Sequence, residues 1–296
     1  MTTITDPSYV DPALINPRAV RLVEAFKDAL IRLRDEEGLT FDDLKAGADV
    51  LQKIQAVTGG PLALMAMPLY SELFQDGRDG YTPSDDVDSP TYIPGSPPIG
   101  NPGTLPMRPD EPGTPLTASG RVLDGHGRPL ADARMEIYHA ANNGNYSGQY
   151  DDGVPKHNLR GHLFTDDDGR YTFTTVTPIP YTDRQVAAID GIPEVAAALG
   201  RSLYRPAHIH FEVHHPDLTT PWYGEIYFKG DPVIPVDLVG AKIAHPALQA
   251  DTALHEDSQD IAEAGFPGPY RTTEFDFVLK TRTSPDTFAP KRATTA

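Results

Sequence analysis

Four histidines fall within eight positions, 208 to 215, of the stretch YRPAHIHFEVHHP. The apolar and β-branched residues from Ala207 to Val213 predict a strand, in which successive side chains point to opposite faces. His208 and His210 then share one face. Two imidazoles at this spacing can give one metal ion two nitrogen ligands, although an isolated H-x-H is more often a pair of surface or hydrogen-bonded histidines. His214 and His215 run into a turn-like stretch and receive no role.

Tyrosine is a second residue type that could bind a metal here. Tyr146 lies in a glycine- and asparagine-rich loop directly after a predicted strand, and Tyr181 lies at the end of another. A phenol has an ordinary pKa of about 10, so binding as phenolate at neutral pH needs a strong Lewis acid. Ferric iron suits an anionic oxygen better than zinc or ferrous iron does. From the residues alone, other tyrosines stay available: Tyr150, Tyr171, Tyr204, Tyr223 and Tyr227.

Composition narrows the classes of function. The chain has no cysteine, which excludes thiolate metal sites and leaves His, Tyr, Asp and Glu as ligands. Its 25 Lys and Arg against 42 Asp and Glu, a formal charge of −17, argue against nucleic acid and against an anionic membrane surface as partners. No run of about 18 apolar residues occurs, and the first residues lack a signal-peptide pattern. We therefore expect a cytoplasmic protein with no membrane partner.

The elements that must position these residues differ between the two ends of the chain. Residues 17–36 have apolar side chains at helical spacing and predict an amphipathic helix. A second helix is predicted after Thr40, which has Asp43 three residues on and is a plausible N-cap. The apolar stretch 61–74 is interrupted by Pro68, which predicts two helical pieces.

A proline-rich connector separates the helices from a strand region. Ten of the 30 prolines lie between residues 83 and 115, too many for a ladder or a helix, and the aromatic residues among them indicate that the segment packs over something. Beyond it, short runs of period two separated by turn signals are typical of an antiparallel sandwich. The sequence thus predicts an α+β fold: a helical region over residues 1–80 and an antiparallel β-sandwich over 81–296, with the Pro-rich segment 81–115 leading into it.

The order of three motifs resembles the intradiol ring-cleavage dioxygenases, the catechol and hydroxyquinol 1,2-dioxygenase group. The motifs are SGRVLDGHGRPLADARMEIYHAANNGNYSGQYD, NLRGHLFTDDDGRYTFTTVTPIPY and RPAHIHFEV. The resemblance covers about residues 115–230, and the helical part is more loosely similar to the dimerisation region of that family. It implies a non-haem ferric ion held by two tyrosines and two histidines. The matching positions are Tyr146, Tyr181, His208 and His210.

The resemblance also implies roles, substrates and partners. Arg205 matches an arginine that stabilises charge developing on the substrate ring, a role that a fixed guanidinium can perform without reorganisation. Tyr181 matches the tyrosine that leaves the iron when a diol chelates it. The implied reaction uses an aromatic diol and O2 and gives a cis,cis-muconate. A homodimer, a lipid in the helical region and a pocket closed by Tyr92, Ile93 and Pro94 are further expectations.

Glu225 stands where catechol dioxygenases commonly have a glutamine, in the stretch WYGEIYF. An acidic group there could accept a hydrogen bond from an additional ring hydroxyl. We therefore expect cleavage of catechols generally, with hydroxyquinol or a substituted catechol among the better substrates.

Two alternatives follow from the same residues. The first is a non-enzymatic prealbumin-like β-sandwich binding module, which would have no reason to keep two tyrosines, two histidines and Arg205 together. The second is a ferrous enzyme with two histidines and one carboxylate, which would recruit Glu212 or Glu225. Of these, Glu212 is the better candidate because it shares the strand face of His208 and His210.

Overall fold

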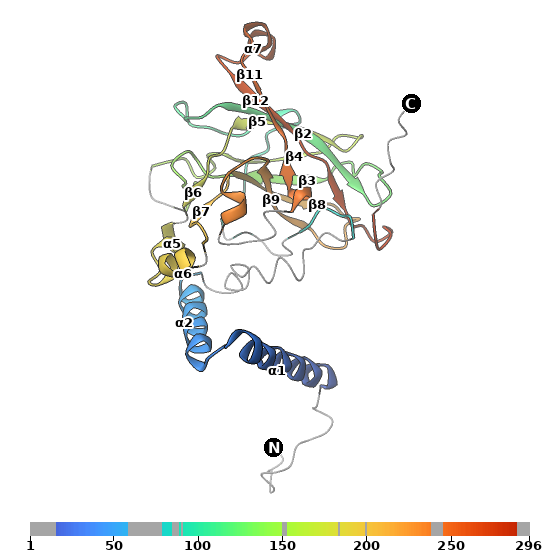
Figure 1. The fold of residues 1–296 in the computed structure, drawn as a ribbon. Helices are drawn as coiled ribbons and strands as arrows, with labels where there is room; N and C mark the ends of the chain where they lie inside the picture. The colour runs from blue at the N-terminus through green and yellow to red at the C-terminus, as the bar shows by residue number, and fades with distance from the viewer. Residues whose placement is uncertain are drawn as a thin grey trace, which may run out of the picture. The chain divides into compact units, whose positions relative to one another are not determined.

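A computed structural model of the chain describes residues 16–58, 79–84, 89, 91–149, 153–182, 184–198, 200–237 and 245–288. Two compact units divide between Lys53 and Ile54, and each is described by itself. The fold is mixed α+β, with sheets and few helices (Figure 1). The helical stretch predicted over residues 61–74 lies outside the described residues.

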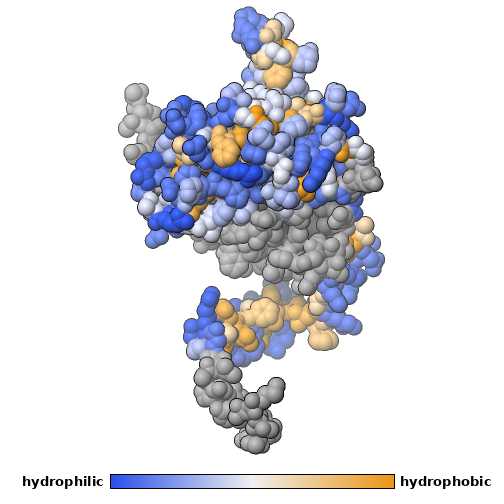
Figure 2. Space-filling model, turned by 180° about the vertical axis from the view of Figure 1, so that it is seen from behind, coloured by the Kyte–Doolittle hydropathy of each residue, from blue (hydrophilic) through white to orange (hydrophobic). Residues whose placement is uncertain are grey.

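Two helices begin the described chain: α1 (Pro17–Glu37) and α2 (Phe41–Thr58). The side chain of Asn16 accepts hydrogen bonds from the amides of residues 18 and 19, and Gly38 ends α1 in the left-handed conformation with φ of 72°. The predicted cap of α2 is confirmed, because Asp43 N donates to Thr40 Oγ1 at 3.2 Å and Thr40 N donates to Asp43 Oδ2 at 2.8 Å. The α1 helix buries none of its residues, and Figure 2 shows apolar side chains along its surface.

The described residues form three sheets. The six-stranded sheet contains β1 (Gly103–Thr104), β2 (Pro115–Asp124), β5 (Arg170–Val176), β11 (Thr252–His255), β12 (Tyr270–Glu274) and β13 (Phe277–Leu279). The five-stranded sheet has the order β10 (Gln249–Ala250), β9 (Trp222–Phe228), β8 (His208–His214), β3 (Arg134–Tyr138) and β4 (Arg160–Phe164). A two-stranded sheet pairs β6 (Tyr181–Thr182) with β7 (Tyr204–Arg205).

The pairing is not antiparallel throughout, as the predicted antiparallel sandwich would have it. Strand β2 runs antiparallel to β5 but parallel to both β12 and β13, and the short strands β1 and β10 also pair in parallel. Antiparallel partners need only a hairpin, whereas parallel partners need a long connection. Strands β12 and β13 pair with β2 although they are far from it in the sequence. The alternation of apolar and polar residues within a strand predicts its faces but not the direction of its partner.

Both large sheets contribute to one hydrophobic cluster. Phe173 of β5 and Phe277 of β13 meet Phe211 of β8 with ring centroids 6.0 and 5.2 Å apart. Along β8, Ile209 and Phe211 belong to this core, while His208 and His210 alternate with them and point to the other face. A single strand therefore supplies both packing and chemistry.

The Pro-rich connector covers the polar face of the five-stranded sheet. Ser96 Oγ donates to Glu136 of β3, the amide of Ile99 donates to His162 O at 2.9 Å, and the ring of Tyr92 lies 6.0 Å from that of Tyr138. The described part of the connector forms no helix. These contacts support the expectation that the segment packs over another part of the fold.

Short helices complete the described chain. They are α5 (Arg184–Ala187), α6 (Ile192–Ala198), α7 (Ser258–Ala264) and the 3₁₀ turns Ile234–Val236 and Pro246–Leu248. In Figure 1, α7 lies at the tip of the β11–β12 hairpin. Among the described helices, none has the length and apolar character needed to cross a membrane.

Candidate metal centre

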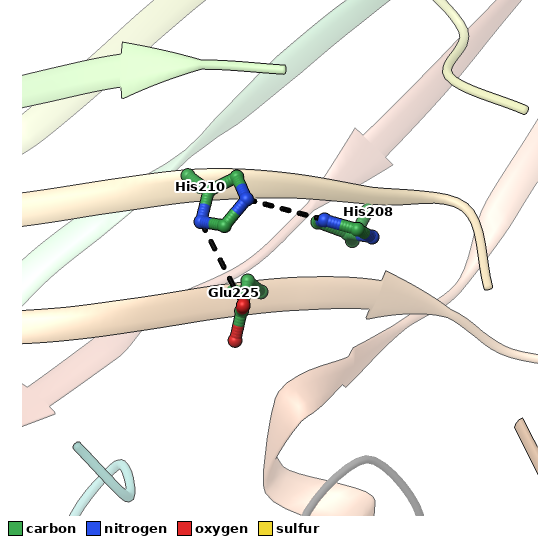
Figure 3. Close-up of side chains that lie close together, drawn as sticks. All are labelled: His208, His210 and Glu225. Carbon is green, nitrogen blue, oxygen red and sulfur yellow. Dashed lines mark hydrogen bonds and ion pairs between the residues drawn. The ribbon is translucent and has the colours of Figure 1, made fainter. Parts of the chain in front are cut away.

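Two imidazoles converge on the polar face of β8. His208 and His210 are 2% and 4% exposed, and their Nε2 atoms lie 3.2 Å apart. Figure 3 shows both rings on β8, with Glu225 approaching from the neighbouring strand. The alternation predicted for this strand is confirmed, and it brings the two candidate nitrogen ligands together.

Burial and a hydrogen bond favour the neutral imidazole, which is the form that binds metals. His208 Nδ1 lies 2.7 Å from Pro206 O, which can only accept, so Nδ1 carries the proton and Nε2 keeps its lone pair. Burial, and then the charge of Arg205, lowers the pKa of His208 to about 4. Burial also holds the pKa of His210 well below its ordinary value, against the opposing effect of Glu225. Both imidazoles are therefore neutral at pH 7, as ligands must be.

Both predicted tyrosines reach the same point. Tyr146 Oη lies 3.0 Å from His208 Nε2, 2.9 Å from His210 Nε2 and 3.0 Å from Tyr181 Oη. Tyr146 is buried and Tyr181 half-buried. Gly144, with φ of 78°, permits this approach, because a Cβ there would lie 2.9 Å from Tyr181 Cβ.

These four groups fit a metal ion. Ligand atoms bound at about 2.0–2.1 Å to one ion lie roughly 3 Å from one another, which is the spacing observed here. Burial, reinforced by the neighbouring Tyr181, raises the pKa of Tyr146 well above its ordinary value. Without a cation, two phenol protons must serve two Nε2 lone pairs and two phenol oxygens. A bound cation would relieve the repulsion between these lone pairs and favour the phenolate.

Arg205 lies in a buried network beside these groups. Its Nε donates to Asp237 Oδ2 at 3.0 Å and its Nη2 donates to the Tyr227 hydroxyl at 3.2 Å. That hydroxyl donates to Glu225 Oε2 at 3.1 Å. Burial alone would lower the pKa of Arg205, but Asp237, Tyr227 and Glu225 outweigh it and raise the pKa well above the ordinary value. The guanidinium is thus a fixed cation at this end of the site.

Glu225, and not Glu212, is the carboxylate that approaches the histidines. Glu225, His208 and His210 offer ligand atoms within 4.8 Å of one another. Glu225 Oε1, however, lies 3.7 Å from Nδ1 of His210, on the other side of the ring from the nitrogen that faces Tyr146. Glu212 instead accepts a hydrogen bond from Tyr138 at 3.3 Å. The preference for Glu212 in a two-histidine, one-carboxylate site is wrong, and the position of Glu225 suits a group that orients His210.

The segment expected to close the pocket lies beside the Tyr146 loop. Tyr92 packs on the cluster that contains Tyr138 and Tyr146, and Ile93 Cδ1 would be 2.7 Å from a Cβ on Gly148. Pro94 is exposed. Substrate contact by Tyr92, Ile93 and Pro94 stays a prediction.

Two of the other candidate tyrosines have different partners. Tyr171 is in the core and donates to Phe275 O at 2.6 Å, and Tyr227 serves the Arg205 network. Tyr150 lies outside the described residues. Sequence reasoning missed Tyr138, whose ring stacks on His210 at 4.7 Å and 6°, and Asp237. Only the pairing register, which places Tyr138 opposite His210, reveals the first of these.

A mixed α+β fold with a buried cluster of histidines and tyrosines that could hold a metal ion is typical of a metal-dependent enzyme, and comparisons with known proteins give its family. A family model described as Dioxygenase matches residues 87–281. The chain is 30% identical to chlorocatechol 1,2-dioxygenase of Rhodococcus opacus over 90% of this chain and 99% of that protein. It is 33% identical to catechol 1,2-dioxygenase 2 of Acinetobacter lwoffii, over 74% and 80%. The crystal structure of 3-chlorocatechol 1,2-dioxygenase from Rhodococcus opacus 1CP superposes with a TM-score of 0.69 at 26% identity, covering 89% and 98%.

The chain therefore belongs to the intradiol ring-cleavage dioxygenase family and is an enzyme of the catechol or hydroxyquinol 1,2-dioxygenase type. The family resemblance read from the motifs is confirmed. The alternative of a non-enzymatic binding module finds no support in these comparisons.

Proposed function

We propose that the protein is a non-haem Fe(III) dioxygenase that cleaves catechol-type diols between the two hydroxyls with O2, giving cis,cis-muconate-type products. The observation that carries the proposal is the convergence of two neutral imidazoles and two phenols, without a thiolate: Tyr146 Oη lies within 3.0 Å of both Nε2 atoms and of Tyr181 Oη, and the two Nε2 atoms lie 3.2 Å apart. This donor set suits a hard, highly charged ion.

Each ligand has a distinct part in the proposal. His208, His210, Tyr146 and Tyr181 would hold the ion, which when bound supplies Lewis acidity toward the two diol oxygens. Tyr181 is the more exposed phenol, which supports its assignment as the ligand that a diol displaces. Its freed oxygen would then accept a proton from a substrate hydroxyl.

Arg205 would stabilise negative charge on the diol ring. Its two hydrogen bonds to Asp237 and Tyr227 fix the guanidinium plane before substrate arrives. A preoriented cation requires no reorganisation as charge develops.

Glu225 supports hydroxyquinol or another substituted catechol as a preferred substrate. Its carboxylate lies next to both Arg205 and His210, at 3.7 Å from each, where an additional ring hydroxyl could donate to it. Hydroxyquinol 1,2-dioxygenases are among the similar proteins, at 37% identity over 57% of this chain for one from a Rhizobium strain. Tyr92, Ile93 and Pro94 would close this pocket.

The assembly that we propose follows the same family. The shared core of the two large sheets supports a β-sandwich catalytic domain over residues 81–296. The exposed apolar side chains of α1 support a dimerisation region within residues 1–80, with a lipid bound there. We propose a cytoplasmic homodimer.

The colour and metal content of the purified protein test the proposal. Phenolate-to-iron charge transfer should make it red to burgundy, with about one iron per chain. The band should move when catechol is added without O2. A colourless protein that contains stoichiometric zinc would contradict the ferric assignment.

A further inference from the structure

A buried arginine lies beside the metal centre with most of its donors unused. Arg160, the first residue of β4, is 2% exposed. Its Nε donates to the carbonyl and the hydroxyl of Ser147 at 3.1 and 3.0 Å. Its Nη1 and Nη2 are buried and have no hydrogen-bond partner among the residues that the structure describes.

The guanidinium instead faces two aromatic rings. Arg160 Cζ lies 5.1 Å from the centroid of Tyr138 and 5.7 Å from that of Tyr146. Tyr138 stacks in turn on His210. The strand register explains this, because Arg160, Tyr138, His210 and Glu225 are successive cross-strand neighbours on β4, β3, β8 and β9.

Such an arrangement is costly in the absence of a metal. Burial lowers the pKa of Arg160, and Tyr138, Tyr146 and the carboxylates of Glu136 and Glu212 oppose that effect. A buried cation with unpaired N–H groups destabilises a fold unless something compensates for it. Neutral rings compensate only in part. The buried guanidinium with unpaired N–H groups therefore indicates a role other than stabilising the fold.

We infer that Arg160 is a positioning residue: a buried cation that compensates the negative charge of Tyr146 when that side chain binds a metal as phenolate. The inference rests on the proposed function, since it requires the phenolate. A negative ring under the guanidinium attracts it far more strongly than a neutral ring does. The cation thereby lowers the energy of the phenolate and makes it easier for Tyr146 to lose its proton when a metal binds.

The first test measures stability and iron affinity together. Arg160→Met and Arg160→Gln remove the charge, and glutamine keeps an N–H that can reach Ser147. Without metal, both variants should unfold at the same temperature as the parent or higher. Their iron dissociation constants should nevertheless rise roughly ten- to thirtyfold, whereas Arg160→Lys, which keeps the charge, should change less.

The second test is spectroscopic. Loss of the nearby cation raises the energy of the phenolate electrons. In the two neutral variants, Arg160→Met and Arg160→Gln, the phenolate-to-iron band of the iron-loaded protein should therefore move to longer wavelength. Arg160→Lys should stay closer to the parent. Arg170→Met is the matched control, because Arg170 is exposed and pairs with Asp168 at the surface; its band should not move.

The outcomes separate this inference from the proposed function. A parent protein without an iron-dependent band contradicts the proposed function. A coloured parent with an unshifted band in the neutral variants overturns only the role of Arg160. Failure of both neutral variants to fold without metal, while Arg160→Lys folds, also overturns it, because the cation would then serve the fold.

Discussion

Substituting Tyr146 by phenylalanine perturbs the centre of the site with the smallest change in shape. The side chain is 3% exposed, and its hydroxyl lies within 3.0 Å of both His208 Nε2 and His210 Nε2. The hydroxyl has one proton, so it donates to one acceptor at a time. Its loss leaves a buried acceptor unpaired, which costs about 1–3 kcal/mol of unfolding free energy in the metal-free protein. For a domain of this size, that lowers Tm by roughly 2–10 °C.

The effect on iron should be much larger than the effect on folding. If Tyr146 binds iron as proposed, Tyr146→Phe removes a buried anionic ligand, so iron affinity and turnover should both be lost. Tyr181→Phe removes the half-buried phenol, and this variant should keep more iron and still bind catechol. Iron content, thermal unfolding and the visible spectrum of both variants, measured beside the parent, give the comparison.

The two spectra decide whether these tyrosines are ligands. Both substitutions should shift the visible band, and they should do so unequally. Equal and unperturbed spectra in the two variants would refute the ligand assignment. Tyr150 would then be the next to substitute, since the hydroxyl of Tyr171 is already bound to Phe275 O in the core.

Three further predictions concern the surrounding charges. Glu225→Gln should change the ratio of kcat/KM for hydroxyquinol and catechol by the equivalent of about 1–3 kcal/mol; an unchanged ratio would remove Glu225 from substrate choice. Asp237→Asn should lower the unfolding free energy in urea by roughly 3 kcal/mol, because Asp237 is fully buried against Arg205, and a wild-type midpoint would contradict this. His139 is buried with its Nε2 2.7 Å from Thr175 Oγ1, and burial lowers its pKa from 6.5 to about 4. The unfolded state therefore binds this proton first, and His139 should contribute a loss of about 2 kcal/mol of stability between pH 7 and 5, which His139→Asn should reduce.

Much of the site could be predicted because alternation along a strand is a local property. The pattern of residues 207–213 assigns Ile209 and Phe211 to one face and the two histidines to the other, and the structure has this arrangement. The ends of strands, where Tyr146 and Tyr181 lie, are also local features marked by glycine, asparagine and proline.

The neighbours of the histidines could not be predicted in the same way, because they depend on strand pairing. Residues two apart on one strand are separated by nearly 7 Å, whereas cross-strand partners are about 5 Å apart. Glu225 is the cross-strand partner of His210 and therefore approaches it more closely than Glu212 does. The same limit applies to Tyr138 and to the parallel return of β12 to β2.

The charges on this buried face bear on what the centre can hold. Four buried carboxylates lie on or beside this face: Glu136, Glu212, Glu225 and Asp237. Arg134 pairs with Glu136, while Arg205 pairs with Asp237 and lies 3.7 Å from Glu225. The low local dielectric strengthens every such interaction. Two phenolates would add two negative charges to this face, so the centre favours a cation of high charge, and the buried guanidinium of Arg160 would stabilise Tyr146 once that side chain has become a phenolate.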